Sequence, residues 1–358
     1  MESAKISTQD SATLQEILSQ PLAWTGSLRS LETNVAIASI LEKTDSVMEF
    51  LFIGCGTSFY LAEAAAASWT VLTGQPARAL PASELLLFPA LSLPRGSQPQ
   101  AVVISRSGST SEAVRAASFL TRVARIVTLG LTCSPNSPLA SECELTIELS
   151  TADEKSTVMT RSFTSMLLVL QHLAARKSGA KKFCDSLAKI PDSTSPLLTS
   201  FSERIDAFME NRSFDDYVFL GQGPFQGIAR EASLKVTEMS CSFSQAYHTL
   251  EFRHGPKAIV SPETCLTFFI SESGAQAECE VLAEMKELGA IVVAICNRAN
   301  KTIRSSSDLV FELELDAPET ATLAPSVVPA QLLGFHAGIK KGLNPDSPKN
   351  LSRVVLLD

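Results

Sequence analysis

The chain has 358 residues and a formal net charge of −8, from 38 acidic and 30 basic side chains. This acidic balance argues against an extended nucleic-acid or anionic-membrane surface, so any bound anion must be held locally. With 45% hydrophobic residues, the chain can bury ordinary cores, and its length suits two domains. The eight cysteines are scattered, without a C-x-x-C pair or a nearby histidine at metal-ligand spacing. We therefore expect reduced, mostly buried thiols, no metal site and no cofactor.

The first twenty residues are polar and mixed in charge, and they lack the basic start and apolar core of a signal peptide. No apolar run approaches the roughly 18 residues that are needed to span a bilayer. The sequence therefore favours a cytoplasmic protein that does not enter a membrane.

An internal repeat is the main feature of the pattern along the chain. EFLFIGCGTSFYLAEAAAASW, from Glu49, reads as a strand, a glycine turn and a helix, and YVFLGQGPFQGIAREASLKVTE, from Tyr217, has the same order. AVVISRSGSTSEAVRAA, from Ala101, is matched in the same way by LTFFISESGAQAECEVLAEM, from Leu266. A third apolar strand follows in each half, and the offset between the halves is about 167 residues. The sequence predicts two tandem, doubly wound, parallel-sheet α/β domains of the flavodoxin-like kind, related by internal duplication.

The domain boundaries follow from this repeat. We expect an N-terminal helical segment over residues 1–40, a first domain over 41–195 and a second domain over 201–320. A C-terminal helix and site-completing tail would occupy 321–358. The segment IPDSTSPLLTS, from Ile190, is rich in Pro, Ser and Thr, which places the junction near Ser200.

The first Ser-rich turn is a candidate phosphate cradle. Open α/β sheets bind ligands beyond the carboxyl ends of their strands, where helix N-termini point N–H groups at an anion. Hydroxyls, one flexible glycine and one cation gather in this turn, as Ser105, Arg106, Ser107, Gly108, Ser109, Thr110 and Ser111. Thr57 and Ser58, in the neighbouring turn, add further donors. Serines also cap helices without binding anything, but so many hydroxyls in one loop favour an anion site.

The second copy of this turn differs in a way that disfavours phosphate. Glu272 stands where the first copy has Arg106, and its carboxylate would repel an anion. A nicotinamide cofactor is also disfavoured, because neither Gly-x-Gly turn has a third glycine at the fingerprint spacing.

A candidate catalytic stretch runs from Glu231 to Pro256. Glu231, Lys235 and Glu238 share one helical face, and His254 follows in the loop Arg253-His254-Gly255-Pro256. The spacing alone fits a solvated Glu-Lys pair equally well. His172 and His336 lie in apolar helical patterns and are interpreted as packing or surface residues.

The combination of FIGCGTS, ISRSGSTSE, TVMTRSFT, LGQGPFQGIAREASLKVTEMS, EFRHGPKAIV and NPDSPKNLSRVV resembles the sugar isomerase (SIS) domain family over most of the chain. It is similar to the isomerase half of glutamine:fructose-6-phosphate aminotransferases and to the amino-sugar-phosphate deaminase and tagatose-6-phosphate ketose-aldose isomerase group. The opening resembles that second group, and no N-terminal glutaminase with its nucleophilic cysteine is present, so we expect no ammonia source on the chain.

The resemblance implies roles for individual residues. It assigns the 6-phosphate to Ser58, Ser105, Arg106, Ser107 and Thr110, with Thr57 alongside. Glu238 matches the carboxylate that moves a proton between C1 and C2, while Lys235 and Glu231 match polar groups of the same site. His254 matches a histidine that opens the sugar ring and comes from a neighbouring subunit, which implies a homodimer with a shared active site.

One departure bears on the reaction. Arg353 stands where the aminotransferases have a lysine that forms an imine with the sugar, and a guanidinium that stays protonated cannot do this. The sequence therefore favours deamination with isomerisation of an amino-sugar 6-phosphate. The alternatives are an aminotransferase-like enzyme, a pure ketose/aldose phosphate isomerase and a non-catalytic sugar-phosphate sensor, although a DNA-binding module typical of sensors is not evident.

Overall fold

The computed structural model describes residues 11–32, 49–94, 96 and 99–357, which form two compact units. The first-domain unit comprises the described residues of 22–154, 161–188 and 352–357. The second-domain unit comprises residues 11–21, 155–160 and 189–351. The N-terminal helix α1 (Ala12–Leu18) thus belongs to the second-domain unit, whereas the C-terminal end belongs to the first. Parts of the expected N-terminal segment 1–40 lie outside the described residues.

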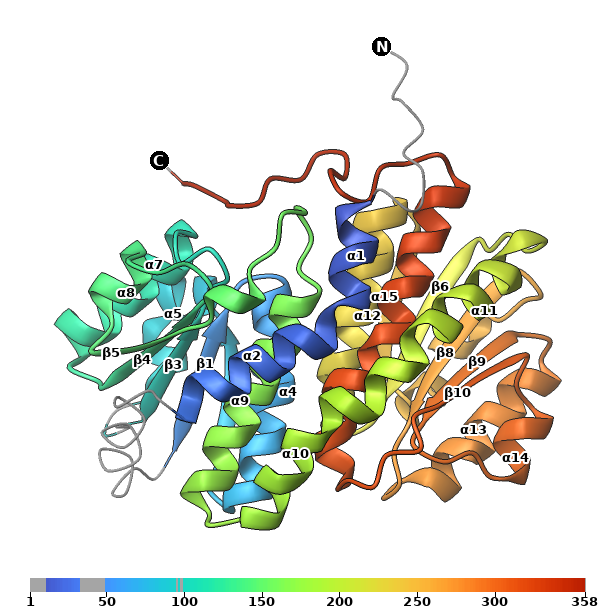
Figure 1. Ribbon diagram of the computed structural model, residues 1–358, viewed down its shortest axis with the longest axis horizontal. Helices are drawn as coiled ribbons and strands as arrows, with labels where there is room; N and C mark the ends of the chain where they lie inside the picture. Colours follow the sequence, from blue (N-terminus) through green and yellow to red (C-terminus); the bar gives the residue numbers. More distant parts are fainter. Residues whose placement is uncertain (1–10, 33–48, 95, 97–98, 358) are drawn as a thin grey trace. The chain divides into compact units, whose positions relative to one another are not determined.

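The first-domain unit is built on a five-stranded parallel sheet in the order β2-β1-β3-β4-β5 (Figure 1). The strands are β1 (Phe50–Gly54), β2 (Ala77–Pro81), β3 (Gln100–Ile104), β4 (Thr128–Thr132) and β5 (Leu145–Glu148). The helices are α4 (Thr57–Thr73), α5 (Ala82–Leu87), α6 (Pro89–Ser92), α7 (Ser111–Ser118), α8 (Pro138–Glu142) and α9 (Arg161–Lys177), with most of α2 (Gln20–Glu32).

Alternate side chains of β1 meet helices on opposite faces of this sheet. Leu51 and Ile53 enter a buried cluster with residues of α5 and α7. Phe50 and Phe52 contact Trp69 of α4, with ring centroids 4.3 and 5.7 Å apart. Because both faces are covered, the strands read as unbroken apolar runs, and the prediction of a doubly wound parallel sheet is confirmed.

The second-domain unit repeats this topology, with the strand order β7-β6-β8-β9-β10. The strands are β6 (Asp216–Gly221), β7 (Phe243–His248), β8 (Thr264–Ile270), β9 (Ile291–Cys296) and β10 (Leu309–Glu312). The helices are α11 (Leu198–Glu210), α12 (Phe225–Ser240), α13 (Ala275–Glu287), α14 (Lys301–Ser305) and α15 (Leu323–Lys340). Leu266 and Phe268 of β8 join the apolar cluster with α13, whereas Thr267 faces a small cavity lined by α11 and α15. The two units therefore share one strand order, as the predicted duplication requires.

The structure adds strands that the repeat did not indicate. The sequence predicted three strands in each half, and each sheet has five. The additional strands are β2, β5, β7 and β10, and their residues are mostly half-buried rather than buried. The break expected from Ile190 also comes later, since α10 (Lys181–Thr194) continues through Pro191.

Candidate functional site

The predicted phosphate loop links the buried strand β3 to the start of α7. Ser105, Arg106 and Gly108 are buried, and Ser107, Ser109 and Thr110 are half-buried. Thr110 occupies the N-cap position of α7 without making a side-chain capping hydrogen bond. Ser107 Oγ accepts the Ser109 N–H at 3.2 Å, so its own O–H remains able to donate to a ligand. The loop thus presents hydroxyls at a helix N-terminus, where a phosphate is stabilised.

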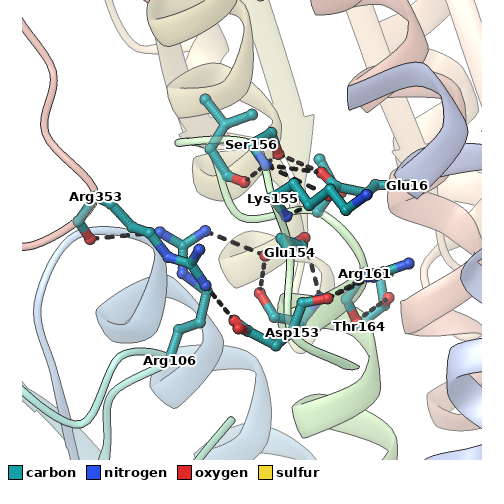
Figure 2. A network of polar contacts seen from close by, with 12 residues as sticks. Glu16, Arg106, Asp153, Glu154, Lys155, Ser156, Arg161, Thr164 and Arg353 are labelled. Carbon is teal, nitrogen blue, oxygen red and sulfur yellow. Dashed lines mark hydrogen bonds and ion pairs between the residues drawn. The ribbon is translucent and has the colours of Figure 1, made fainter. Parts of the chain in front are cut away.

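Arg106 does not extend into solvent. Its guanidinium pairs with Glu154, at 3.2 Å between Nη1 and Oε2, and the two side chains are 4% and 0% exposed (Figure 2). Glu154 also accepts hydrogen bonds from Ser162, from Oγ at 2.5 Å and from the backbone N–H at 3.2 Å. Glu154 was not predicted from the sequence, where its only signal was its place next to the TVMTRSFT motif.

The C-terminal tail lies along the same loop. The backbone oxygen of Arg353 accepts a hydrogen bond from Arg106 Nη2 at 3.4 Å, and the Arg353 side chain pairs with Asp153 (Figure 2). The oxygen of Val355 accepts the N–H of Ser111 at 3.2 Å, and the Leu357 N–H donates to Ser111 Oγ at 3.0 Å. Arg353 is therefore engaged in an ion pair beside the loop.

Thr57 and Ser58 open α4 at the end of β1, and both are buried. A Cβ at Gly54 would lie 2.3 Å from the backbone oxygen of Ser58, so only glycine lets the helix start so close to the strand. Gly221 has the same constraint in the second copy, where a Cβ would lie 2.3 Å from the oxygen of Phe225. The two copies of this turn are thus built in the same way.

The second-domain unit holds the predicted carboxylate cluster on α12. Lys235 is fully buried and contacts two carboxylates of its own helix, Glu231 at 3.5 Å and Glu238 at a shorter distance. Glu231 is also fully buried, whereas the Glu238 side chain is 18% exposed. A buried ammonium between two carboxylates is unusual for a solvated helix face, and Glu238 is the member that a ligand can reach.

Glycines on α15 allow that helix to pack closely against α12. A Cβ at Gly338 would lie 2.3 Å from the oxygen of Met239, and one at Gly334 would lie 3.0 Å from the oxygen of Lys235. The backbone that carries Lys235 and Glu238 is therefore held by a close contact between two buried helices (Figure 1).

His254 lies on an exposed loop just after a short 3₁₀ turn, Glu251–Arg253. Its neighbours Arg253 and Lys257 both pair with Glu284 of α13, at 2.6 and 2.8 Å, and these hydrogen bonds lower the pKa of Glu284. Within the described part of the chain, the imidazole itself makes no hydrogen bond or ion pair with the α12 cluster. The structure thus groups Glu231, Lys235 and Glu238, and it leaves His254 at the surface.

The second Ser-rich turn already holds a carboxylate of the same chain. Glu319 accepts the backbone N–H groups of Glu272 and Ser273, and Ser273 Oγ donates to it at 2.6 Å. The carboxylate of Glu272, which we expect to repel an anion, accepts a hydrogen bond from Asn297 at 2.8 Å. Two N–H donors of this loop, those of Glu272 and Ser273, are therefore engaged by Glu319.

No helix in the described part of the chain is both long and apolar enough to cross a membrane.

A family model for the SIS domain matches the chain twice, over residues 47–176 and 215–340. Among curated proteins, the chain is 26% identical to the isomerizing glutamine–fructose-6-phosphate aminotransferase of Methanothermobacter thermautotrophicus, over 96% of this chain and 57% of that protein. It therefore spans little more than half the length of this relative. A Streptomyces coelicolor protein named as a candidate D-galactosamine-6-phosphate deaminase, AgaS, is also 26% identical, over 94% of this chain and 91% of its own.

Two solved structures are similar over nearly their whole length. Glucosamine-6-phosphate deaminase from Thermotoga maritima is 29% identical, with a TM-score of 0.78 over 97% of this chain and 100% of the other. Tagatose-6-phosphate ketose/aldose isomerase from Escherichia coli has a TM-score of 0.85 over 100% and 98%, and at 23% identity it supports the fold alone. The two family matches coincide with the two five-stranded units, and the chain belongs to the SIS domain family, of which it carries two copies.

Proposed function

We propose that the chain is an amino-sugar-6-phosphate deaminase that isomerises its substrate and releases ammonia. The observation that carries this proposal is the α12 cluster, in which the partly exposed Glu238 contacts the buried Lys235. The relatives named as amino-sugar-phosphate deaminases support the substrate class, and they match nearly the full length of the chain.

The phosphate is assigned to the first-domain loop. Ser105, Ser107 and Thr110 supply hydroxyls, and Thr57 and Ser58 supply donors at the start of α4. Arg106 is the cation of this loop. The hydroxyl groups of these serines and threonines are neutral donors at two helix N-termini. Such a place suits a phosphate monoester, because helix dipoles favour an anion there.

Glu238 is assigned the proton transfer, with Lys235 and Glu231 holding it in place. In the open-chain amino aldose phosphate, a carboxylate removes the proton from C2 and returns it to C1. The aldehyde becomes the C1 alcohol and the C2 amine becomes an imine. Water then adds to that imine, and the products are a 2-ketose phosphate and ammonia. No imine with the protein is needed, which agrees with Arg353 at the position where aminotransferases have lysine.

His254 is assigned to opening of the sugar ring. Its exposed position on an anchored loop suits a residue that acts on a substrate held by a second copy of the chain, so the proposal includes a homodimer. A cytoplasmic location stays a prediction of the sequence.

The test is ammonia release from purified protein, coupled to glutamate dehydrogenase, with glucosamine-6-phosphate and galactosamine-6-phosphate supplied separately. We expect release from one of them. Glu238→Gln should lower kcat by at least about 100-fold, because the amide cannot accept the C2 proton, while binding of the sugar phosphate persists. Glu287→Gln is the matched control, since Glu287 is an exposed glutamate on α13.

Full ammonia release by Glu238→Gln would remove this residue from the mechanism. Binding of both sugars without ammonia release would reject deamination. Ketose formation from glucose-6-phosphate or galactose-6-phosphate would then favour the pure isomerase.

A further inference from the structure

The predicted phosphate loop contains one arginine, and the structure gives that arginine a buried partner. Arg106 and Glu154 are both almost completely excluded from solvent, although 48 residues separate them in the chain. A buried charge pair is stable only when its remaining donors and acceptors are satisfied. Glu154 also accepts two hydrogen bonds from Ser162, and Arg106 Nη2 also donates to the backbone oxygen of Arg353.

Two ion pairs lie next to the loop. Arg106 and Glu154 form one pair, and Arg353 and Asp153 form a second pair beside it (Figure 2). All four of these charged groups act on the buried thiol of Cys133. Burial raises its pKa most, both carboxylates raise it further, and both guanidinium groups lower it. Each of these two pairs next to the loop therefore joins one guanidinium to one carboxylate.

We propose that Glu154 is a positioning residue of the phosphate site, which fixes the side chain of Arg106 within the loop and offsets its charge. The inference rests on the proposed function, since it takes the Ser105–Thr110 loop as the phosphate site. A sugar phosphate is then held by the hydroxyl groups of the loop, and Arg106 acts on it through the shape of the loop.

Arg106 also joins three segments that are distant in sequence. Its backbone oxygen accepts the N–H of Cys133 at 2.9 Å and the hydroxyl of Thr132 at 3.1 Å. Its side chain reaches Glu154 and the Arg353 oxygen. Losing Arg106 alone removes the cation that faces the buried Glu154 carboxylate, and the negative charge that Arg106 no longer offsets opposes phosphate.

The experiment is a double-mutant cycle on the affinity for inorganic phosphate, measured by titration calorimetry on the full chain. The variants are Arg106→Gln, Glu154→Gln and the two combined. We expect Arg106→Gln to weaken phosphate binding roughly tenfold, because Glu154 is then uncompensated. The combined variant should recover most of that loss, to within about threefold of the natural chain, because no buried charge is left.

The matched control neutralises another ion pair of the same unit. Arg122 and Glu142 form this pair, with 2.8 Å between Nη2 and Oε1. Arg122→Gln with Glu142→Gln should leave phosphate affinity unchanged. Melting temperatures are measured for every variant, since a purely structural pair would change stability without changing phosphate affinity at equal folded fraction. If Glu154→Gln fails to fold, Arg106→Gln and the combined variant still decide, because the prediction is the recovery of affinity between these two.

A combined variant that binds phosphate at least tenfold more weakly than the natural chain would make Arg106 a direct ligand and overturn the proposal. The proposal would also be overturned if all three variants bound phosphate as tightly as the natural chain, since neither residue would then position the loop. Failure of the proposed function looks different. If the natural chain binds no phosphate, the phosphate site itself is rejected. If it binds phosphate but releases no ammonia, deamination is rejected, and the double-mutant cycle on phosphate affinity can still be interpreted.

Discussion

At the scale of single residues, Gly108 decides the shape of the phosphate loop. Its φ is +60°, and a Cβ there would lie 2.1 Å from Ser137 Oγ and 2.4 Å from Ser137 Cβ. Rotation of the serine hydroxyl can relieve the first contact but not the second. The backbone conformation and the close packing both require glycine.

Gly108→Ala should therefore lower the free energy of unfolding by about 2 kcal/mol or more and weaken phosphate binding. Gly179→Ala separates the two causes, because Gly179 has a φ of +70° and a Cβ there would meet no atom within 4 Å. That control should cost only about 1 kcal/mol and leave phosphate affinity unchanged. Urea denaturation and phosphate titration check both statements, and equal losses in the two variants would contradict the packing argument.

The residues of the site differ in how far the sequence could predict them. Ser105 to Ser111 are contiguous, so their shared chemistry is visible in the sequence itself. Glu231, Lys235 and Glu238 follow helical spacing, but only the structure reveals that Lys235 is fully buried. Glu154 could not be predicted, because its role depends on a pairing across 48 residues that no local pattern records.

At the scale of elements, His336 links α15 to α11. Its Nε2 lies 3.0 Å from Ser202 Oγ, and its Nδ1 lies 3.1 Å from Asp206 Oδ1. Ser202, His336 and Asp206 are connected in the order of a hydrolytic triad, but here the serine is the buried member and the aspartate is the exposed one. Ser202 is only 9% exposed, whereas the Asp206 side chain is 74% exposed, so the hydroxyl faces the protein interior. The arrangement is a helix-to-helix contact, in agreement with the interpretation of His336 as a packing residue.

That contact predicts a pH dependence of stability. Burial lowers the pKa of His336 and outweighs the opposing effect of Asp206, so the folded chain keeps the imidazole neutral. The unfolded chain binds a proton as the pH falls through about 6.5, and the folded state does not follow until the pH is lower. The contribution of His336 to stability is therefore present above about pH 6.5 and is lost as the pH falls.

Urea midpoints between about pH 7.5 and about pH 5.5 test this sign. His336→Gln should flatten the decline, because glutamine keeps hydrogen bonding without titrating. His172 adds a slope of the same sign, since burial and then Arg176 lower its pKa, so the flattening is partial. An unchanged slope in His336→Gln would mean that the helix contact does not depend on the neutral imidazole.

Edge strands were the elements that the sequence did not indicate. The burial of β2 and β7 is partial along nearly their whole length, so their residues lack the unbroken apolar run of the central strands β1 and β6. Partial burial gives no clear period, and a strand of this kind resembles a loop in sequence. The glycine turns were visible because steric contacts at Gly54 and Gly221 allow no other residue.

At the scale of the whole molecule, one duplicated fold carries two different loops. The strand orders match, and the turn glycines Gly56 and Gly223 have φ values of +56° and +55°. In the second loop, the N–H groups of Glu272 and Ser273 are engaged by an internal carboxylate, that of Glu319. The duplication could be predicted from repeated motifs, but Glu319 could not, because it lies 46 residues from the serine that it contacts.

This asymmetry predicts one phosphate per chain, and equivalent serines in the two loops test it. Ser107→Ala combined with Thr110→Ala should weaken inorganic phosphate binding by about tenfold or more, since two donors to the anion are lost. Ser273→Ala, at the equivalent position of the second loop, should leave the affinity and the stoichiometry unchanged, because Ser273 Oγ serves Glu319. Calorimetric titration gives both quantities at once. A stoichiometry of two, or a loss of affinity in Ser273→Ala, would mean that the second loop binds phosphate despite Glu319, and that the copies have not diverged in this respect.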